Sequence, residues 1–236
     1  MRIKKDCFLL TRPIAHRGLW GNGVVENSLT AYKNAAEKGY PIEIDLFLTT
    51  DGEIVTFHDD ALSRMTGADG KIYEKTLKEL KALSLGGTDE RIPTFAEVLS
   101  AVNGKVPLLI EIKDQPNDSV VDIAVAKLKE YVGEFAVQSF NPFYVKRVKR
   151  LAPEFIRGIL ATDEKERGRI TNFVLKYMPF NFMIKPDFIA YKKTGLKLAK
   201  RKAKKTPLLA WTITNQAEKV AALTYADNII FENFIP

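Results

Sequence analysis

Residues 42–47 read IEIDLF, a short apolar run that carries two acids at alternate positions. Because side chains alternate between the two faces of a β-strand, Glu43 and Asp45 are expected on one face. A later apolar run carries Glu111 and Lys113 in the same relation. Charged side chains near the carboxyl ends of buried strands are typical of a (β/α)8 barrel, where they face the mouth that holds the active site. These two strands therefore favour a TIM barrel.

The rest of the chain repeats an alternation of β-rich runs with helical patterns, which indicates an α/β fold. Eight strands with intervening helices in 236 residues match the (β/α)8 barrel. A doubly wound sheet has the same periodicity and remains an alternative at this point. The expected strands are residues 12–16, 42–47, 107–112, 135–139, 156–160, 187–191, 207–213 and 228–232.

Several helix starts are marked by capping residues. Thr94 and Glu97 have the spacing of a capping box, and Asn215 with Glu218 has the same spacing near the end of the chain. Asn141 precedes a proline, which is favoured at the first helical position. These signals, with a further cap at Asn27 or Ser28, predict one helix after each strand.

We predict a single domain over residues 1–236, with an insertion at about residues 60–93 after the second barrel strand. The insertion contains paired glycines and only a modest helical pattern. An extra strand at 53–57 is expected before it, paired through the turn at Asp51-Gly52.

Composition excludes several classes of protein. A single cysteine, Cys7, allows neither an internal disulfide nor a cysteine zinc site. The apolar runs are far shorter than the roughly 20 residues that span a bilayer, and the N-terminus lacks a signal sequence, so a cytoplasmic location is expected. Much of the net charge of +7 falls in residues 192–205. We interpret that segment as a solvated helix face or a weak membrane-surface contact, and expect no nucleic-acid partner. The sequence gives no oligomeric state.

The chain has two histidines, His16 and His58, and both follow predicted strands beside polar residues. Imidazole is the side chain best suited to proton transfer near neutral pH. We expect the pair to flank a substrate, one as general base and the other as general acid.

The acids Glu43, Asp45 and Glu111 form a set of oxygen ligands without cysteine, which suits Mg²⁺ or Ca²⁺ rather than zinc. The alternative is that Glu43 and Asp45 lie on the surface of an edge strand or are paired with Arg17 and Lys113. If the acids bind a cation, Arg17 and Lys113 add positive charge for an anion, for which phosphate is the natural candidate.

A series of short motifs in fixed order covers nearly the whole chain, and through it the protein resembles the glycerophosphodiester phosphodiesterase family. The match of several ordered motifs is far more specific than a solitary short match. The motifs are IAHRG (14–18), ENSL (26–29), EID (43–45), TDGEIV (50–55), HD (58–59), PTFAEVL (93–99), IEIK (110–113), QSF (138–140) and WT (211–212).

The resemblance implies a hydrolase of lipid and glycerol metabolism, which splits a small-molecule glycerophosphodiester into sn-glycerol 3-phosphate and an alcohol with a divalent cation. On the same basis His16 and His58 would be the acid–base pair, Glu43, Asp45 and Glu111 would hold the metal, Arg17 and Lys113 would contact phosphate, Trp211 would line the substrate pocket, and Glu26 with Asn27 would organise the first loop.

Two other functions compete with this one. A phospholipase D-like or C-like enzyme acting on lysophospholipids would use the same two-histidine site, and a barrel without catalysis would serve as a phosphodiester-binding module. The chain also departs from the family at residues 227–232, DNIIFE, where the family typically has Asp-Gly-Ile-Ile-Thr-Asp. This departure bears on the role of the last strand.

Overall fold

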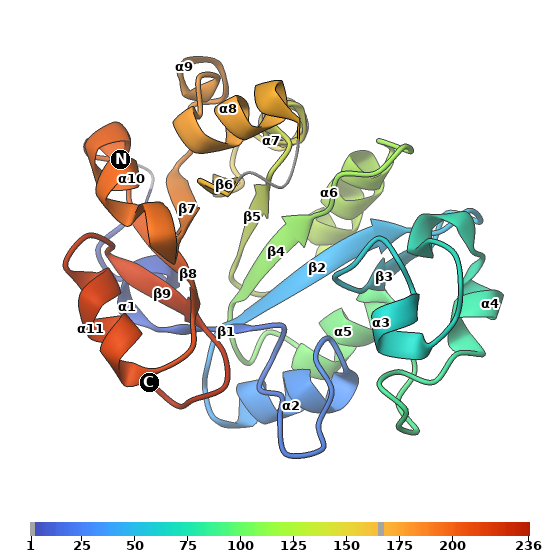
Figure 1. Cartoon of the computed structure of the whole chain (residues 1–236). Coiled ribbons are helices and arrows are strands. Elements are labelled where there is room, and N and C mark those ends of the chain that lie inside the picture. The colour runs from blue at the N-terminus through green and yellow to red at the C-terminus, as the bar shows by residue number, and fades with distance from the viewer. Residues whose placement is uncertain (1–2, 165–167) are drawn as a thin grey trace. The chain divides into compact units, whose positions relative to one another are not determined.

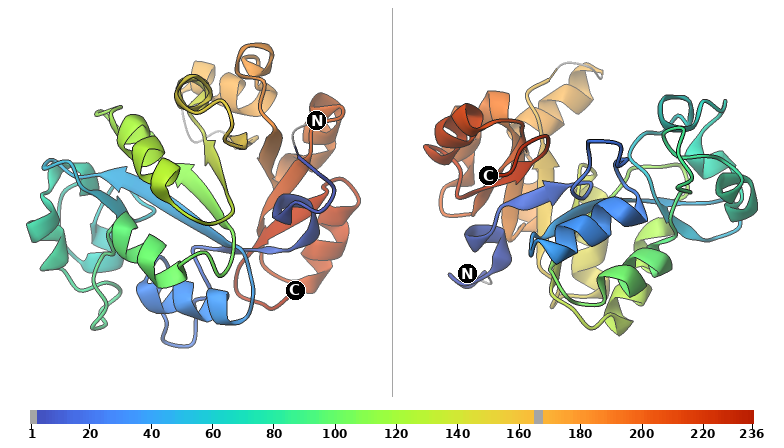
Figure 2. Two further views of the ribbon diagram at one scale, coloured as in Figure 1. Left: turned by 180° about the vertical axis from the view of Figure 1, so that it is seen from behind. Right: turned by 90° about the horizontal axis from the view of Figure 1, so that it is seen from below.

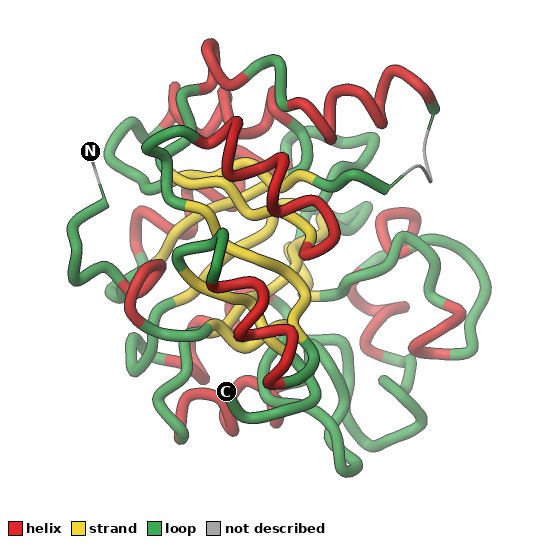
Figure 3. Tube along the Cα trace, turned by 60° about the vertical axis from the view of Figure 1, so that its left-hand side comes forward, coloured by secondary structure: helices red, strands yellow, loops and turns green. Residues whose placement is uncertain are grey.

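The computed structural model describes residues 3–164 and 168–236. The chain divides into two compact units, an N-terminal unit of Ala15–Phe135 and a C-terminal unit of Ala136–Pro236 together with Met1–Ile14. Strands and helices alternate along both units. Figure 3 distinguishes the strands, in yellow, from the helices, in red. The described residues hold the eight predicted barrel strands and one additional strand. The fold class is the predicted (β/α)8 barrel, not the doubly wound sheet.

In the N-terminal unit, strand β2 (Ile42–Leu48) lies between the parallel strands β1 (Ile14–His16, beginning at the last residue of the segment Met1–Ile14) and β4 (Leu108–Ile112). All seven residues of β2 are buried, as expected for a strand that is covered on both faces. The strand register sets His16 beside Glu43 and Asp45 beside Glu111. The backbone pairing thus brings these four residues together before any side-chain contact is considered.

The extra strand is β3 (Ile54–Thr56), which pairs antiparallel with the end of β2. In the turn between them the Thr49 hydroxyl donates to the Asp51 carboxylate at 2.6 Å, and Gly52 has a φ of +85°. Glycine adopts this left-handed backbone without a steric cost. The predicted strand and turn are therefore confirmed, and they carry the chain toward His58.

Three longer helices complete the N-terminal unit: α2 (Leu29–Glu37), α5 (Phe95–Val102) and α6 (Val120–Glu130). Ser28 caps α2, and the predicted box of Thr94 and Glu97 caps α5. The capped helices α2 and α5 lie side by side (Figure 2).

The segment predicted as an insertion contains α3 (Ser63–Thr66), η1 (Ile72–Glu74) and α4 (Leu77–Lys81), which gather beside β3 (Figure 1). A buried apolar cluster beneath these short elements includes Phe47 and Phe57 from the sheet side and Leu62 and Leu80 from the segment. This shared core holds the segment in place. The limits of the insertion and the single-domain organisation remain predictions.

The C-terminal unit contains β5 (Phe135–Ser139, beginning at the last residue of the N-terminal unit), β6 (Arg157–Ala161), β7 (Phe188–Lys192), β8 (Leu208–Ile213) and β9 (Asn228–Phe231), in that order and parallel from β5 to β9. Its helices are α1 (Phe8–Thr11), α7 (Pro142–Leu151), α8 (Arg169–Tyr177), α9 (Asn181–Ile184), η2 (Lys193–Gly195), α10 (Leu196–Ala203) and α11 (Gln216–Leu223).

The cap of α11 differs from the predicted box. Asn215 accepts from the backbone N–H of Glu218, as expected, but the Glu218 carboxylate accepts from the N–H and hydroxyl of Thr214 instead of from Asn215. Thr214 offers two donors, its backbone N–H and its hydroxyl, and the Glu218 carboxylate therefore accepts from Thr214.

Asn228 accounts for one departure from the family pattern. Its buried side-chain amide donates to the carbonyls of Phe8, Leu9 and Arg12, at 3.4, 3.1 and 2.6 Å. A glycine at this position would leave those carbonyls without the amide. Asn228 therefore fastens α1 to β9.

Among the described residues, no helix combines the length and the apolar character that crossing a bilayer requires.

Candidate active site

The centre of the site is a cluster of three acids from β2 and β4. One carboxylate oxygen each from Glu43, Asp45 and Glu111 lies within 4.8 Å of the others, and all three residues are buried. The register between β2 and β4 places these positions together. The alternative of an exposed edge strand is therefore wrong.

The side chains of Lys113 and Arg17 contact the acids, which agrees with the alternative that the acids are paired with these two cations. Lys113 Nζ lies 3.4 Å from Asp45 Oδ1 and 3.0 Å from Glu111 Oε1, and Arg17 Nε lies 3.7 Å from Asp45 Oδ2. Although burial disfavours the ammonium, the carboxylates of Glu111 and Asp45 raise the pKa of Lys113. The lysine is therefore permanently charged at the site. The acids are both clustered and paired.

The three acids do not share these cations equally. Burial raises the pKa of Glu43 well above its ordinary value, and the charges of Asp45 and Glu111 add to the shift. Burial also disfavours the charged form of Asp45, but Lys113 and His58 outweigh it and lower the pKa of Asp45. The surrounding protein groups thus compensate the negative charge of Glu43 less than that of Asp45.

The loop after β1 brings backbone and side-chain donors to the cluster. Arg17 has a left-handed φ of +58°, and its N–H donates to Glu43 Oε2 at 3.2 Å. The indole N–H of Trp20 donates to the carbonyl of His16 at 3.0 Å. The ring of His16 comes to 4.0 Å from Glu43, measured from Nε2 to Oε2. Gly18 allows this tight turn to pack directly on α2.

Glu26 and Asn27 lie against the same cluster. Glu26 Oε1 accepts from Arg17 Nη1 at 2.8 Å, so the acid orients the guanidinium. Asn27 donates to Asp45 Oδ2 at 3.0 Å and accepts from the buried hydroxyl of Tyr32 at 2.7 Å. Tyr32 thereby fixes the orientation of the Asn27 amide.

His58 follows β3 and is oriented by an acid. Its Nδ1 lies 2.6 Å from Asp59 Oδ1, while the other oxygen of Asp59 pairs with Arg64 Nε. Arg64 also reaches Glu26, at 2.6 Å from Nη2 to Oε1. This arginine therefore connects the loop after β1 with the loop after β3.

Sequence reasoning missed Arg64 and Tyr32. Arg64 lies within the predicted insertion, and its spacing from His58 does not mark it as part of a site. Tyr32 lies on the apolar face of α2, where a tyrosine ordinarily indicates core. Only the hydroxyl contact with Asn27 reveals its role.

Trp211 lies on β8 in the C-terminal unit and is partly buried. Its ring meets Phe140 edge to face, with 5.7 Å between centroids, and Lys192 Nζ lies 5.8 Å from the ring centroid. The indole nitrogen is buried and has no hydrogen-bond partner among the described residues.

The fold and the acid cluster with its flanking histidines define a class of barrel hydrolase, and comparisons with known proteins identify the family. The chain belongs to the glycerophosphoryl diester phosphodiesterase family, whose model matches residues 16–234. A glycerophosphodiester phosphodiesterase of Caldanaerobacter subterraneus subsp. tengcongensis is 35% identical over 80% of this chain and 84% of the relative. The lysophospholipase D GDPD1 of Rattus norvegicus is 32% identical over 56% of this chain and 44% of the relative.

A solved structure gives the same result. An Oleispira antarctica phosphodiesterase, in complex with the product sn-glycerol-3-phosphate, superposes with a TM-score of 0.79 and 27% identity. The match covers 94% of this chain and 93% of that one. The predicted family and enzyme class are thereby confirmed.

Proposed function

We propose that the protein hydrolyses glycerophosphodiesters to sn-glycerol 3-phosphate and an alcohol, with Mg²⁺ or Ca²⁺ and two histidines. The observation that carries this proposal is the buried cluster of Glu43, Asp45 and Glu111, with His16 and His58 adjoining it. The activity of the relatives, a glycerophosphodiester phosphodiesterase and a phosphodiesterase in complex with sn-glycerol-3-phosphate, supports the substrate class.

The three acids fit a divalent cation. Their ligand atoms are all oxygens, which hard cations prefer, and they converge within 4.8 Å. The raised pKa of Glu43 also indicates negative charge that the protein alone leaves poorly compensated. When bound, such a cation would polarise a phosphoryl oxygen and help to orient the phosphodiester.

Arg17 and Lys113 would hold the phosphate. The Arg17 side chain is anchored through one terminal nitrogen on Glu26, whereas its buried Nε–H has no hydrogen-bond partner among the described residues. An unsatisfied buried donor next to the acids is a natural contact for a phosphate oxygen. Lys113, fixed by Asp45 and Glu111, adds a second permanent charge.

His16 and His58 would move the protons. Asp59 occupies Nδ1 of His58, so Nε2 is the nitrogen available for transfer. One histidine accepts a proton from the attacking oxygen as the new P–O bond forms. The other gives a proton to the alcohol oxygen as its bond to phosphorus breaks. The attacking oxygen is either that of water or a neighbouring substrate hydroxyl, which would first give a cyclic phosphate.

Glu26 and Asn27 would act as positioning residues, because they touch Arg17 and Asp45. For Trp211 we propose contact with the glycerol or alcohol part of the substrate, which is supported by its unpartnered indole N–H. A cytoplasmic location remains a prediction.

The test is release of glycerol 3-phosphate from glycerophosphocholine and glycerophosphoethanolamine, with Mg²⁺ or Ca²⁺ and again with EDTA. Release that stops with EDTA is expected. Glu43→Gln should raise the cation concentration needed for half-maximal rate, whereas Glu37→Gln on the outer end of α2 should leave it unchanged. Release that is insensitive to EDTA would contradict the role of the cation.

Lysophospholipase D activity is the second candidate, favoured by the similarity to the rat lysophospholipase D. Lysophosphatidylcholine would then yield choline and lysophosphatidic acid, whereas a phospholipase C-like reaction would yield phosphocholine. The non-catalytic module is not favoured, because it predicts the loss of at least one acid–base or metal residue and all of them are present in the chain.

A further inference from the structure

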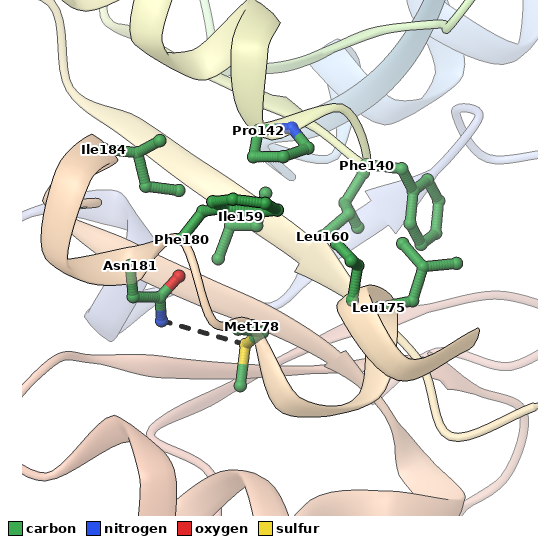
Figure 4. Close-up of a pocket in the computed structure, with 10 residues that line it drawn as sticks. Phe140, Pro142, Ile159, Leu160, Leu175, Met178, Phe180, Asn181 and Ile184 are labelled. Atoms are coloured by element: carbon green, nitrogen blue, oxygen red, sulfur yellow. Dashed lines mark hydrogen bonds between the residues drawn. The ribbon is translucent and has the colours of Figure 1, made fainter. Parts of the chain in front are cut away.

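Helix α8 presents a row of apolar side chains to the outside. Ile170, Phe173 and Tyr177 are spaced three and four residues apart and therefore share one helix face. Their exposed fractions are 82%, 55% and 37%. The contacts of α8 with the core come from Leu175, which is buried, and from the buried C-capping residue Met178 (Figure 4). The exposed row is thus a second apolar face that folding leaves unused.

Among the described residues, the buried face of α8 has no cavity large enough for an organic ligand. It leaves a cavity of about 10 Å³ among side chains that include Ile159 and Leu160 of β6, which is at most the space of one water molecule. Any partner of α8 must therefore bind from the outside.

The surroundings of the exposed row are strongly basic. Helices α7, α8, α9 and α10 together contain ten lysines and arginines and no acid. Two of these cations adjoin the row, because Lys176 Nζ and Lys202 Nζ lie 5.6 and 5.7 Å from the ring centroid of Tyr177.

The charges of the whole chain are also distributed unequally between the two units, and the basic excess lies in the unit that contains α8. The C-terminal unit contains 23 lysines and arginines against nine aspartates and glutamates, and the N-terminal unit contains 13 against 20. The net charge of +7 thus conceals one basic unit and one acidic unit. An anionic partner is attracted to the unit that carries α8.

We propose that α8 and α10 dock the protein on an anionic lipid surface. Ile170 and Phe173 enter the boundary between headgroups and acyl chains, and the basic side chains of α10 contact lipid phosphates. A second copy bound through the same face would bring like charges together. Nucleic acid would match the cations but would leave the apolar row of α8 without a partner.

The test is sedimentation of the full-length protein with vesicles of phosphatidylglycerol and phosphatidylcholine, compared with vesicles of phosphatidylcholine alone. Binding to the anionic vesicles that weakens with salt is expected. The double variant Ile170→Ser, Phe173→Ser and the double variant Arg201→Glu, Lys202→Glu should each lower the partition coefficient roughly tenfold or more.

Matched controls come from the N-terminal unit. Val132 is 90% exposed, so Val132→Ser removes an equally accessible apolar side chain, and Lys105→Glu with Lys129→Glu reverses two exposed charges. Both controls should bind vesicles like the parent protein. Circular dichroism of every variant checks that the fold is retained.

Several outcomes would overturn the docking surface. The first is that the protein does not sediment with anionic vesicles at low salt, and the second is that the α8 variants and the controls lose vesicle binding equally. The third is binding to DNA without binding to vesicles. The fourth is a concentration-dependent dimer that the α8 variants abolish. Hydrolysis of water-soluble glycerophosphocholine is measured separately. Failure of docking is thereby distinguished from failure of the proposed reaction.

Discussion

Gly18→Ala tests whether the loop that carries His16 and Arg17 depends on close packing against α2. Gly18 has a φ of +88°, and a Cβ atom there would lie 2.7 Å from the backbone carbon of Ala31. Because that carbon belongs to a helix backbone, it cannot swing aside as a side chain does. The loop or the helix must move.

Gly23→Ala supplies a matched control. Gly23 has a φ of +89°, but a Cβ atom there would meet nothing within 4 Å. An alanine at a left-handed position costs about 1–2 kcal/mol, which both variants share. Overpacking adds about 1–3 kcal/mol at Gly18 alone. The free energy of unfolding should therefore fall by about 1–2 kcal/mol for Gly23→Ala and by about 2–5 kcal/mol for Gly18→Ala.

Urea unfolding at constant m-value measures both differences, and the midpoint temperature should fall by about 2–4 °C per kcal/mol. Gly18→Ala should also lower kcat, because the displaced loop carries His16 and Arg17, whereas Gly23→Ala should keep the parent rate. Equal destabilisation of the two variants would refute the packing argument. Parent activity in Gly18→Ala would refute the link between this packing and the site.

Three further predictions concern single side chains. His58→Ala should lower kcat by about 10²–10⁴-fold, because it removes an acid–base group, and near-normal turnover would remove it from the mechanism. Arg64→Ala should lower kcat about tenfold with little change in KM, because Asp59, which orients His58, loses its ion pair with Arg64. Arg64→Lys should restore part of that loss. An unchanged kcat in Arg64→Ala would exclude the positioning role. Burial opposes the charged form of Glu97, but its hydrogen bonds with Lys81 and with Thr94 lower its pKa below the ordinary value of 4.5. The ionised Glu97 carboxylate therefore stabilises the folded state above pH 4.5, and this stabilisation is lost as the pH falls through the lowered pKa. Glu97→Gln should lower the free energy of unfolding by about 0.2–1 kcal/mol near neutral pH, because the carboxylate is partly exposed and solvent screens its pairing with Lys81. The difference should disappear in acid, and a pH-independent difference in urea unfolding would contradict this account.

The barrel strands were predictable because their signal is local. Alternation places Glu43 and Asp45 on one face of a strand whatever the rest of the chain does, and the observed strands agree with the predicted ones to within two residues at either end. The caps of α2 and α5 were predictable for the same reason, since they join residues three apart. The cap of α11 differed because Thr214 competed for Glu218, a choice between neighbours that spacing does not settle.

The site was predictable where strand register alone brings residues together. Asp45 and Glu111 meet because β2 and β4 pair in parallel, and the motifs marked both residues beforehand. Arg64 and Tyr32 were not predictable, because their roles depend on how a turn and a helix pack against loops that are distant in the sequence.

The sequence by itself determined the periodicity of the strands, the capped helices, the ordered motifs and the identity of the acids and histidines. These follow from short-range geometry and from residue chemistry. Only the tertiary structure decided that Arg64 joins the loops of Glu26 and Asp59, that Asn228 fastens α1, and that α8 keeps an exposed apolar face. Each of these depends on which surfaces are buried against one another, and burial is a property of the folded chain that no local pattern contains.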